Sequence, residues 1–132
     1  MERRIATTSE QSQRLLRCGV SADTADMVET RLGNLLNRTQ DFPVDETKET
    51  LVWSLSALIG LLPPSITDEN GTYFQLQLTA YPHEEDCYKW NLSYYSIEGE
   101  ISLLYIEAPD PIEACVSMIE LLTANGYKLN EQ

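Results

Sequence analysis

The chain has 132 residues, 42% of them hydrophobic, and a net charge of −12 at pH 7. This length and composition predict roughly one globular domain and exclude disorder along the whole chain. No apolar run approaches the roughly 18 residues of a membrane helix, and the first residues lack the apolar core of a signal peptide, so we expect a cytoplasmic protein without a membrane partner. Three widely spaced cysteines, Cys18, Cys87 and Cys115, are typical of free thiols in a reducing compartment.

The acidic charge is concentrated after the first 38 residues. Residues 39–127 hold most of the 21 acidic residues but only two basic ones, Lys48 and Lys89. An acidic body repels nucleic acid and anionic lipid, so we do not expect direct nucleic-acid binding. Such a surface is either simply well solvated, or it attracts basic proteins, or it imitates the phosphate array of DNA.

Two helices are expected near the N-terminus, so that residues 8–38 form a helical segment. The first runs from the capping residues at Thr8 and Ser9 to Gly19, a residue suited to the end of a helix. The second begins at Ser21 and continues to Leu36 with apolar residues at helical spacing.

The next part of the chain predicts a connection and a short helix. Residues 39–50 are polar and interrupted by proline, so we interpret them as a connection, and one short strand within 44–53 would extend the sheet described below. Ser54 is suited to cap a helix that Pro63 and Pro64 stop abruptly.

Three antiparallel strands are predicted between Tyr73 and Ile106. Residues 73–80 and 87–97 alternate between apolar and polar side chains with a period of two, and residues 101–106 follow a turn. A two-residue loop at Glu98-Gly99 would fix the register of the second hairpin.

This register places the apolar side chains of the hairpin on one face. It pairs Ile97 with Glu100, Tyr94 with Leu103 and Leu92 with Tyr105. Leu103 and Tyr105 would then share a face with Trp90, Leu92 and Tyr94.

A long helix is predicted after the sheet. Asp110 is suited as its N-cap, Pro111 and Glu113 to its first turn, and Gly126 to its end. Strands in one run without crossover helices imply a fold of the α+β class. We therefore expect a single α+β domain over 1–132, in which a three-stranded or four-stranded antiparallel meander carries N-terminal helices and a long C-terminal helix.

The second face of the sheet is the first candidate site. In the expected register it presents Tyr73, Tyr95, Leu104 and Ile106. Either the N-terminal helices cover this face, or it is a surface for a partner or ligand, because contiguous exposed apolar side chains usually mark an interaction site.

An aromatic-lined pocket near Trp53, Tyr88 and Trp90 is the second candidate site. It would serve a small-molecule binder or a small enzyme. No residue is singled out as catalytic, because no nucleophile and base stand at a defined spacing and no glycine-rich phosphate loop is present.

Two further motifs are compatible with a function but also have ordinary structural explanations. Residues 11–28 are similar to a DNA-binding helix-turn-helix, but the second helix would present Asp23 and Asp26 to the phosphates, which favours structural packing. His83 and the acidic residues that lead to Cys87 contain metal-compatible side chains. A single histidine in an acidic loop rarely completes a site of about four ligands, so we expect neither a metal nor a cofactor.

Several segments resemble a group of small uncharacterised proteins from phage-derived and other mobile elements of gut anaerobic bacteria. The resemblance lies in residues 15–19, 24–27, 53–63, 111–114 and 121–127. Its most specific part is Trp53-Ser-Leu-Ser-Ala-Leu58. The resemblance implies cytoplasmic residence and an accessory role in a mobile element, and it supplies no catalytic residue.

The acidic body without a catalytic constellation favours a non-enzymatic accessory protein. Its partner would be another protein, or a second copy of the chain through self-association. Two alternatives stay open, namely a small-molecule binder or small enzyme using the aromatic pocket, and a nucleic-acid role as a DNA mimic or helix-turn-helix regulator.

Overall fold

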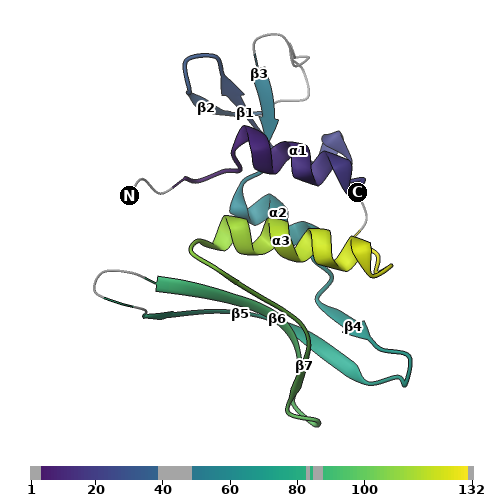
Figure 1. Cartoon of the computed structure of the whole chain (residues 1–132). Coiled ribbons are helices and arrows are strands. Elements are labelled where there is room, and N and C mark those ends of the chain that lie inside the picture. The colour runs from purple at the N-terminus through teal and green to yellow at the C-terminus, as the bar shows by residue number, and fades with distance from the viewer. Residues whose placement is uncertain (1–3, 39–48, 83, 85–87, 131–132) are drawn as a thin grey trace.

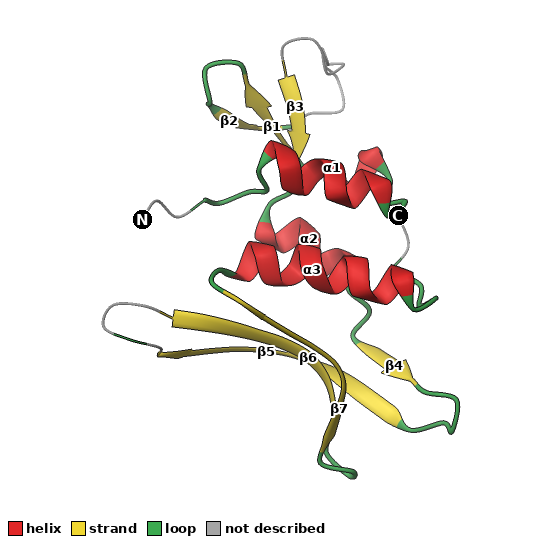
Figure 2. Ribbon diagram, viewed as in Figure 1, coloured by secondary structure: helices red, strands yellow, loops and turns green. Residues whose placement is uncertain are grey.

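A computed structural model describes residues 4–38, 49–82, 84 and 88–130, and it confirms the α+β class. The described elements form three layers, with a small antiparallel sheet on one side, three helices in the middle and a larger antiparallel sheet on the other side (Figure 1). Figure 2 shows the same layers by type of secondary structure. The main core lies where the helices meet the larger sheet.

The first predicted helix is confirmed as α1, Ser9–Arg17. Thr8 caps it through a capping box: the Thr8 side chain accepts from the backbone N–H of Gln11, and the Gln11 side chain accepts from the backbone N–H of Thr8. The helix ends before Gly19, whose φ of +93° lies in the left-handed region that glycine adopts without strain.

The second predicted helix is wrong, so only the first part of the predicted helical segment 8–38 is an α-helix. Ser21 caps only a single 3-10 turn, Ala22–Thr24, and the chain then forms a hairpin of β1, Met27–Thr30, and β2, Leu35–Asn37. The turn of this hairpin contains Gly33 at a φ of +87°, which a continuing helix could not accommodate.

Tertiary contacts explain why the apolar spacing there does not produce a helix. The carboxylate of Asp26 accepts hydrogen bonds from the backbone N–H and the hydroxyl of Ser54, at 2.8 and 2.5 Å. Met27 and Val28 are buried and pair with Val52 and Leu51, whereas Leu32 is 89% exposed in the hairpin turn. The apolar pattern therefore serves a strand and a turn.

The short strand expected within 44–53 exists as β3, Glu49–Val52, but it belongs to the other sheet. It pairs with β1 in a three-stranded sheet of order β2-β1-β3. Most of the predicted connection before it lies outside the described residues.

The short helix and the turn after it are confirmed. Ser54 caps α2, Leu55–Leu61, and accepts from the backbone N–H of Ala57. Pro63 and Pro64 follow, and they lead into β4, Ser65–Thr67, which sequence analysis did not predict.

The larger sheet has the order β4-β5-β6-β7. The three predicted strands are β5, Tyr73–Pro82, β6, Tyr88–Ser96, and β7, Ile101–Ala108. All neighbouring strands are antiparallel. The fourth strand of this sheet is therefore β4 and not a strand from residues 44–53.

The predicted register of the β6–β7 hairpin is correct only next to its turn. The loop has four residues, 97–100, with a φ of +51° at Glu100. Beyond the pair Tyr95–Ser102 a bulge leaves Leu103 without a partner, and Tyr94 then pairs with Leu104.

The bulge exchanges the two faces of β7 relative to the prediction. Leu104 and Ile106 share the helix-facing side with Leu92 and Tyr94, whereas Tyr105 lies on the other side. Leu103, at the bulge itself, packs against the main core. In the predicted register Glu107 would have followed Leu103 and Tyr105 onto the core face, and burying that charge is costly.

The predicted C-terminal helix is confirmed as α3, Pro111–Ala124. The Asp110 side chain accepts from the backbone N–H of Glu113. The helix packs on β6 and β7 on one side and on α1 and α2 on the other. Arg14 of α1 bonds Glu113 at 2.7 Å and Glu120 at 2.5 Å, which ties α1 to α3.

Candidate functional site

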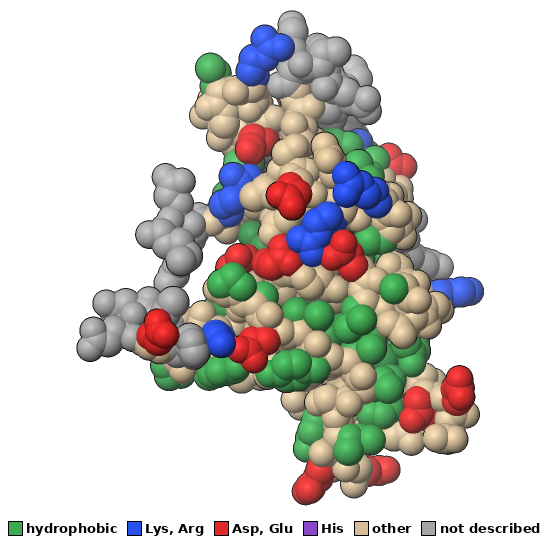
Figure 3. Space-filling view, viewed as in Figure 1, with side chains coloured by type: hydrophobic (Ala, Val, Ile, Leu, Met, Phe, Trp, Pro, Cys, Tyr) green, Lys and Arg blue, Asp and Glu red, His purple; other side chains and the backbone are tan. Residues whose placement is uncertain are grey.

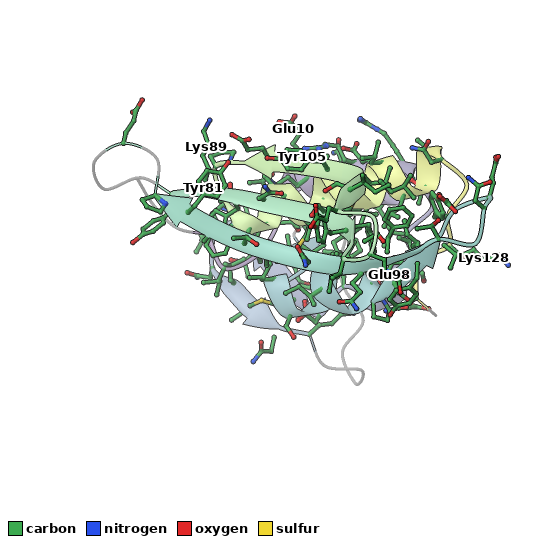
Figure 4. The ribbon with its side chains drawn as sticks, turned by 90° about the horizontal axis from the view of Figure 1, so that it is seen from below. Glu10, Tyr81, Lys89, Glu98, Tyr105 and Lys128 are labelled. Atoms are coloured by element: carbon green, nitrogen blue, oxygen red, sulfur yellow. The ribbon has the colours of Figure 1, made fainter. Side chains whose placement is uncertain are left out.

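The side of the large sheet that points away from the helices is the candidate site. Seen from below, this face lies in front of the rest of the molecule, and no described helix covers it (Figure 4). The first explanation for this face of the sheet, that the N-terminal helices cover it, is wrong. The helix α1 packs against α3 and lies on the side of the helical layer that is farther from the large sheet. We call this surface the open face. Its residues are Tyr73, Gln75, Gln77, Thr79, Tyr81, Lys89, Asn91, Ser93, Tyr95, Tyr105 and Glu107.

The predicted interaction face is divided between the two sides of the sheet. Tyr73 and Tyr95 lie on the open face, where Tyr73 is 54% exposed. Leu104 and Ile106 lie on the helix side and pack against the main core. The open face instead gains Tyr105, which is 49% exposed and which sequence analysis assigned to the core.

The predicted aromatic pocket does not form as one site. Trp53 is fully buried, and its indole N–H donates to the Thr24 hydroxyl at 2.8 Å. Trp90 is half-buried on the helix side of β6, and Tyr88 is 52% exposed at the first residue of that strand. A side chain without exposed surface cannot line an open pocket, so Trp53 is removed from this set.

A hydrogen-bonded cluster occupies one end of the open face. Lys89 pairs with Glu107 at 2.8 Å, and the Tyr105 hydroxyl donates to the other oxygen of Glu107 at 3.2 Å. The Asn91 side chain donates to the Tyr105 hydroxyl at 2.9 Å, and Tyr81 pairs with Lys89 across β5 and β6 on the same face. Figure 4 shows Tyr81, Lys89 and Tyr105 at this end of the sheet. These five residues are called the Glu107 cluster below.

The charge states of the Glu107 cluster suit binding better than proton transfer. The hydrogen bond from Lys89 lowers the pKa of Glu107 despite partial desolvation, and the same bond raises the pKa of Lys89. Desolvation and the bond to Glu107 raise the pKa of Tyr105. All three shifts move away from neutral pH, whereas a general acid or base works best with a pKa near the working pH.

One atom of the cluster lacks a hydrogen bond. The side-chain oxygen of Asn91 is buried and has no partner among the described residues. Leaving such an acceptor without a bond costs about 1–3 kcal/mol.

The buried thiols are not activated as nucleophiles. Desolvation raises the pKa of Cys115 to about 12, and it is also the largest cause of a raised pKa at Cys18. The thiolate is the reactive form, so both side chains are held in their unreactive form at neutral pH.

The remaining sequence motifs give no second site within the described structure. His83 and Cys87, the metal-compatible residues that the sequence analysis considered, lie outside the described residues. In the described part of the chain, no three His, Cys, Asp or Glu side chains are grouped to hold a metal. The helix-turn-helix interpretation of residues 11–28 is wrong as a structure, because a single 3-10 turn and β1 stand where its second helix should be.

Comparison with known proteins adds no family to this description. No family model, no curated protein and no solved structure matches the chain. Within the residues that the structure describes, no helix combines the length and apolar character needed to cross a membrane.

Proposed function

We propose that the chain is a non-enzymatic accessory protein that binds a protein partner through the open face of its large sheet. The observation that carries this proposal is an uncovered sheet face that presents tyrosine and amide side chains. Tyr73 and Tyr105 are each about half exposed, and Gln75 and Gln77 lie between the tyrosines of β5 and are exposed. Tyrosine is enriched in protein interfaces because it offers a large contact area at a small cost in side-chain entropy.

The charge of the molecule supports a basic partner. In Figure 3, acidic side chains stand at the ends of the large sheet, and hydrophobic side chains gather between these ends. Glu69 lies in the turn before β5, and Glu98 and Glu100 lie in the turn before β7. Complementary charge speeds association and selects partners, so a basic protein is favoured over an acidic one.

The proposal is tested by capture of a partner from the lysate of the host cell. The tagged wild-type chain is compared with the double variant Tyr73→Ser and Tyr105→Ser, and size-exclusion chromatography with light scattering reports self-association. We expect a protein that is retained at about 150 mM salt by the wild type, where surface charges beyond roughly 8 Å are screened, and is lost with the double variant.

A matched control variant is available on the other side of the sheet. Tyr88 is 52% exposed but lies on the helix side, so Tyr88→Ser changes the same residue type with similar exposure. The proposal predicts that this variant retains the partner. Equal retention by the wild type and the double variant, or a protein that captures nothing and stays monomeric, would contradict a role of the open face.

A further inference from the structure

The large sheet has an outer edge that the chain itself leaves half occupied. β4 pairs only with residues 73–75 of β5, and the backbone N–H of Leu76 donates to the carbonyl of Pro64 at 3.0 Å. The residues before Ser65 do not continue β4 along β5, because they comprise Pro63, Pro64 and the helix α2. The two prolines lack N–H groups and so cannot donate to β5. In the described structure no strand pairs with residues 77–82 on this side.

The direction of the free backbone groups follows from the bonds of the occupied half. Thr72 and Leu76 direct backbone groups toward β4, since the carbonyl of Thr72 accepts from Asp68 and the N–H of Leu76 donates to Pro64. Alternate residues of a strand bond to the same neighbour, and β5 pairs with β6 without a bulge from Gln75 to Pro82. Leu78 and Ala80 therefore direct their N–H and C=O groups to the empty edge.

The same two residues carry exposed apolar side chains. Leu78 and Ala80 pair with Leu92 and Trp90 and so point to the helix side of the sheet. Leu92 is buried, whereas Leu78 is 37% exposed and Ala80 is exposed. In Figure 1 this end of β5 and β6 extends beyond the helices. A neighbouring strand would thus satisfy the backbone groups and also cover apolar surface.

The edge of β5 lacks the devices that usually prevent strand addition. Residues 77–81 contain no charged residue and no proline, and their pairing with β6 has no bulge. β7, the strand at the opposite edge, has both a bulge at Leu103 and the charged Glu107. The edge of β5 is therefore the better site for strand addition.

We propose that residues 77–81 of β5 bind an extended, basic segment of the partner protein as an additional strand, in line with β4. This inference rests on the proposed function, and it names the kind of partner segment. Apolar side chains at alternate positions would cover Leu78 and Ala80. Basic side chains suit a strand added to an acidic chain, with Glu84 just beyond the end of β5. The net charge of −12 opposes a second copy of the chain at this edge.

The test uses an acetylated heptapeptide of alternating lysine and valine, and the same peptide with N-methylated valines. The methyl groups block strand pairing but leave the charge unchanged. We expect the first peptide to bind and to slow amide hydrogen exchange at Leu78 and Ala80 by at least about tenfold, with no change at Phe74, which already faces β4. N-methylation is expected to weaken binding by about tenfold or more.

Two variants at one position separate strand pairing from charge. Ala80→Pro removes a free N–H without touching the bonds to β6, and edge strands tolerate proline at such positions. Ala80→Ser keeps the N–H. We expect Ala80→Pro to raise the Kd of the peptide by about tenfold and Ala80→Ser to change it less than about twofold.

Each other outcome overturns strand addition. Equal binding of both peptides and both variants would show attraction by charge alone, and the absence of binding would show that the edge accepts no strand. Exchange protection that grows with protein concentration, without peptide, would assign the edge to a second copy. If the captured partner is lost with the Tyr73 and Tyr105 variant but kept with Ala80→Pro, the proposed function stands and strand addition fails.

Discussion

At the scale of single residues, the two tryptophans differ in what they contribute to the core. Trp53 is fully buried and its N–H is bonded to Thr24, whereas Trp90 is half-buried at the end of the sheet that extends beyond the helices. Sequence patterns alone favour Trp90 as the central aromatic residue, because it stands in a clearly alternating strand. The structure assigns that position to Trp53, in the connection between β3 and α2.

This difference gives a paired mutational prediction. Trp53→Ala should lower the free energy of unfolding by about 3–5 kcal/mol, the usual cost of truncating a buried tryptophan. Trp90→Ala should cost roughly half as much, because part of its surface already contacts water. Urea denaturation of both variants measures the difference, and a larger loss for Trp90→Ala would contradict the assignment of the core.

Buried polar groups show the same dependence on tertiary contacts. The Tyr94 hydroxyl is buried and donates to the carbonyl of Pro63 at 2.7 Å, and Thr7 accepts from the backbone N–H of Trp53 at 2.9 Å. Each bond joins segments that are distant in the sequence. Such bonds satisfy groups whose burial would otherwise be costly, and no local pattern predicts them.

At the scale of elements, Arg14 joins the first helix to the last. Its guanidinium contacts Glu113 and Glu120, which lie about two turns apart on α3, and Ser117 between them donates to Glu113. Burial alone would raise the pKa of Glu113. The hydrogen bonds from Arg14, Ser117 and Gln11 outweigh that effect, so the pKa of Glu113 is lowered.

The lowered pKa of Glu113 predicts a loss of stability in acid. A carboxyl whose folded pKa lies below its unfolded pKa stabilises the protein above the unfolded value, near 4.3, and this stabilisation is lost as the pH falls. Arg14→Met removes the main partner, so the variant should lose less stability than the wild type between about pH 5 and pH 3. Denaturation in urea across this range tests the slope.

The variant also separates this contact from general acid denaturation. At pH 7 we expect Arg14→Met to cost about 1 kcal/mol, because the contacts are partly exposed to solvent. Arg17→Met, on the same helix, is the matched control and should leave the acid slope unchanged. Parallel slopes for the wild type and Arg14→Met would show that Glu113 is not stabilised by this contact.

The elements that local signals define were predictable, and those that depend on tertiary contacts were not. α1, α2 and α3 have capping residues, and β5 to β7 have clear alternation. The hairpin of β1 and β2 was missed because apolar residues at helical spacing outweighed Gly33-Asn34, the turn signal that breaks a helix. The bulge at Leu103 was missed although Glu107, which cannot face the core, indicates the correct face.

The same reasons explain the partial prediction of the candidate site. Tyr73 and Tyr95 were placed correctly because the alternation of β5 and β6 is regular. Tyr105 was misplaced with the register of β7, and the Glu107 cluster was missed because its members lie on three strands. Only the correct pairing of those strands brings Tyr81, Asn91 and Glu107 together.

At the scale of the whole molecule, two electrostatic effects of salt oppose one another. Screening weakens the ion pairs of Arg4, Arg14 and Lys89, each of which contributes about 0–1 kcal/mol at an exposed position. Screening also weakens the repulsion within a chain of net charge −12. The excess of acidic over basic residues is larger than the number of these pairs, so relief of repulsion should be the stronger effect.

We therefore expect salt to stabilise the fold. Raising NaCl from about 20 to 300 mM shortens the screening length from roughly 20 Å to about 6 Å. The Tm should rise by about 2–5 °C, the shift that corresponds to about 1 kcal/mol for a chain of this size. Thermal unfolding followed by circular dichroism measures it. The variant Glu69→Gln, Glu98→Gln and Glu100→Gln removes three exposed charges and should show a smaller rise. A Tm that falls with salt would mean that the ion pairs outweigh the repulsion, and it would remove the electrostatic reason for expecting a basic partner.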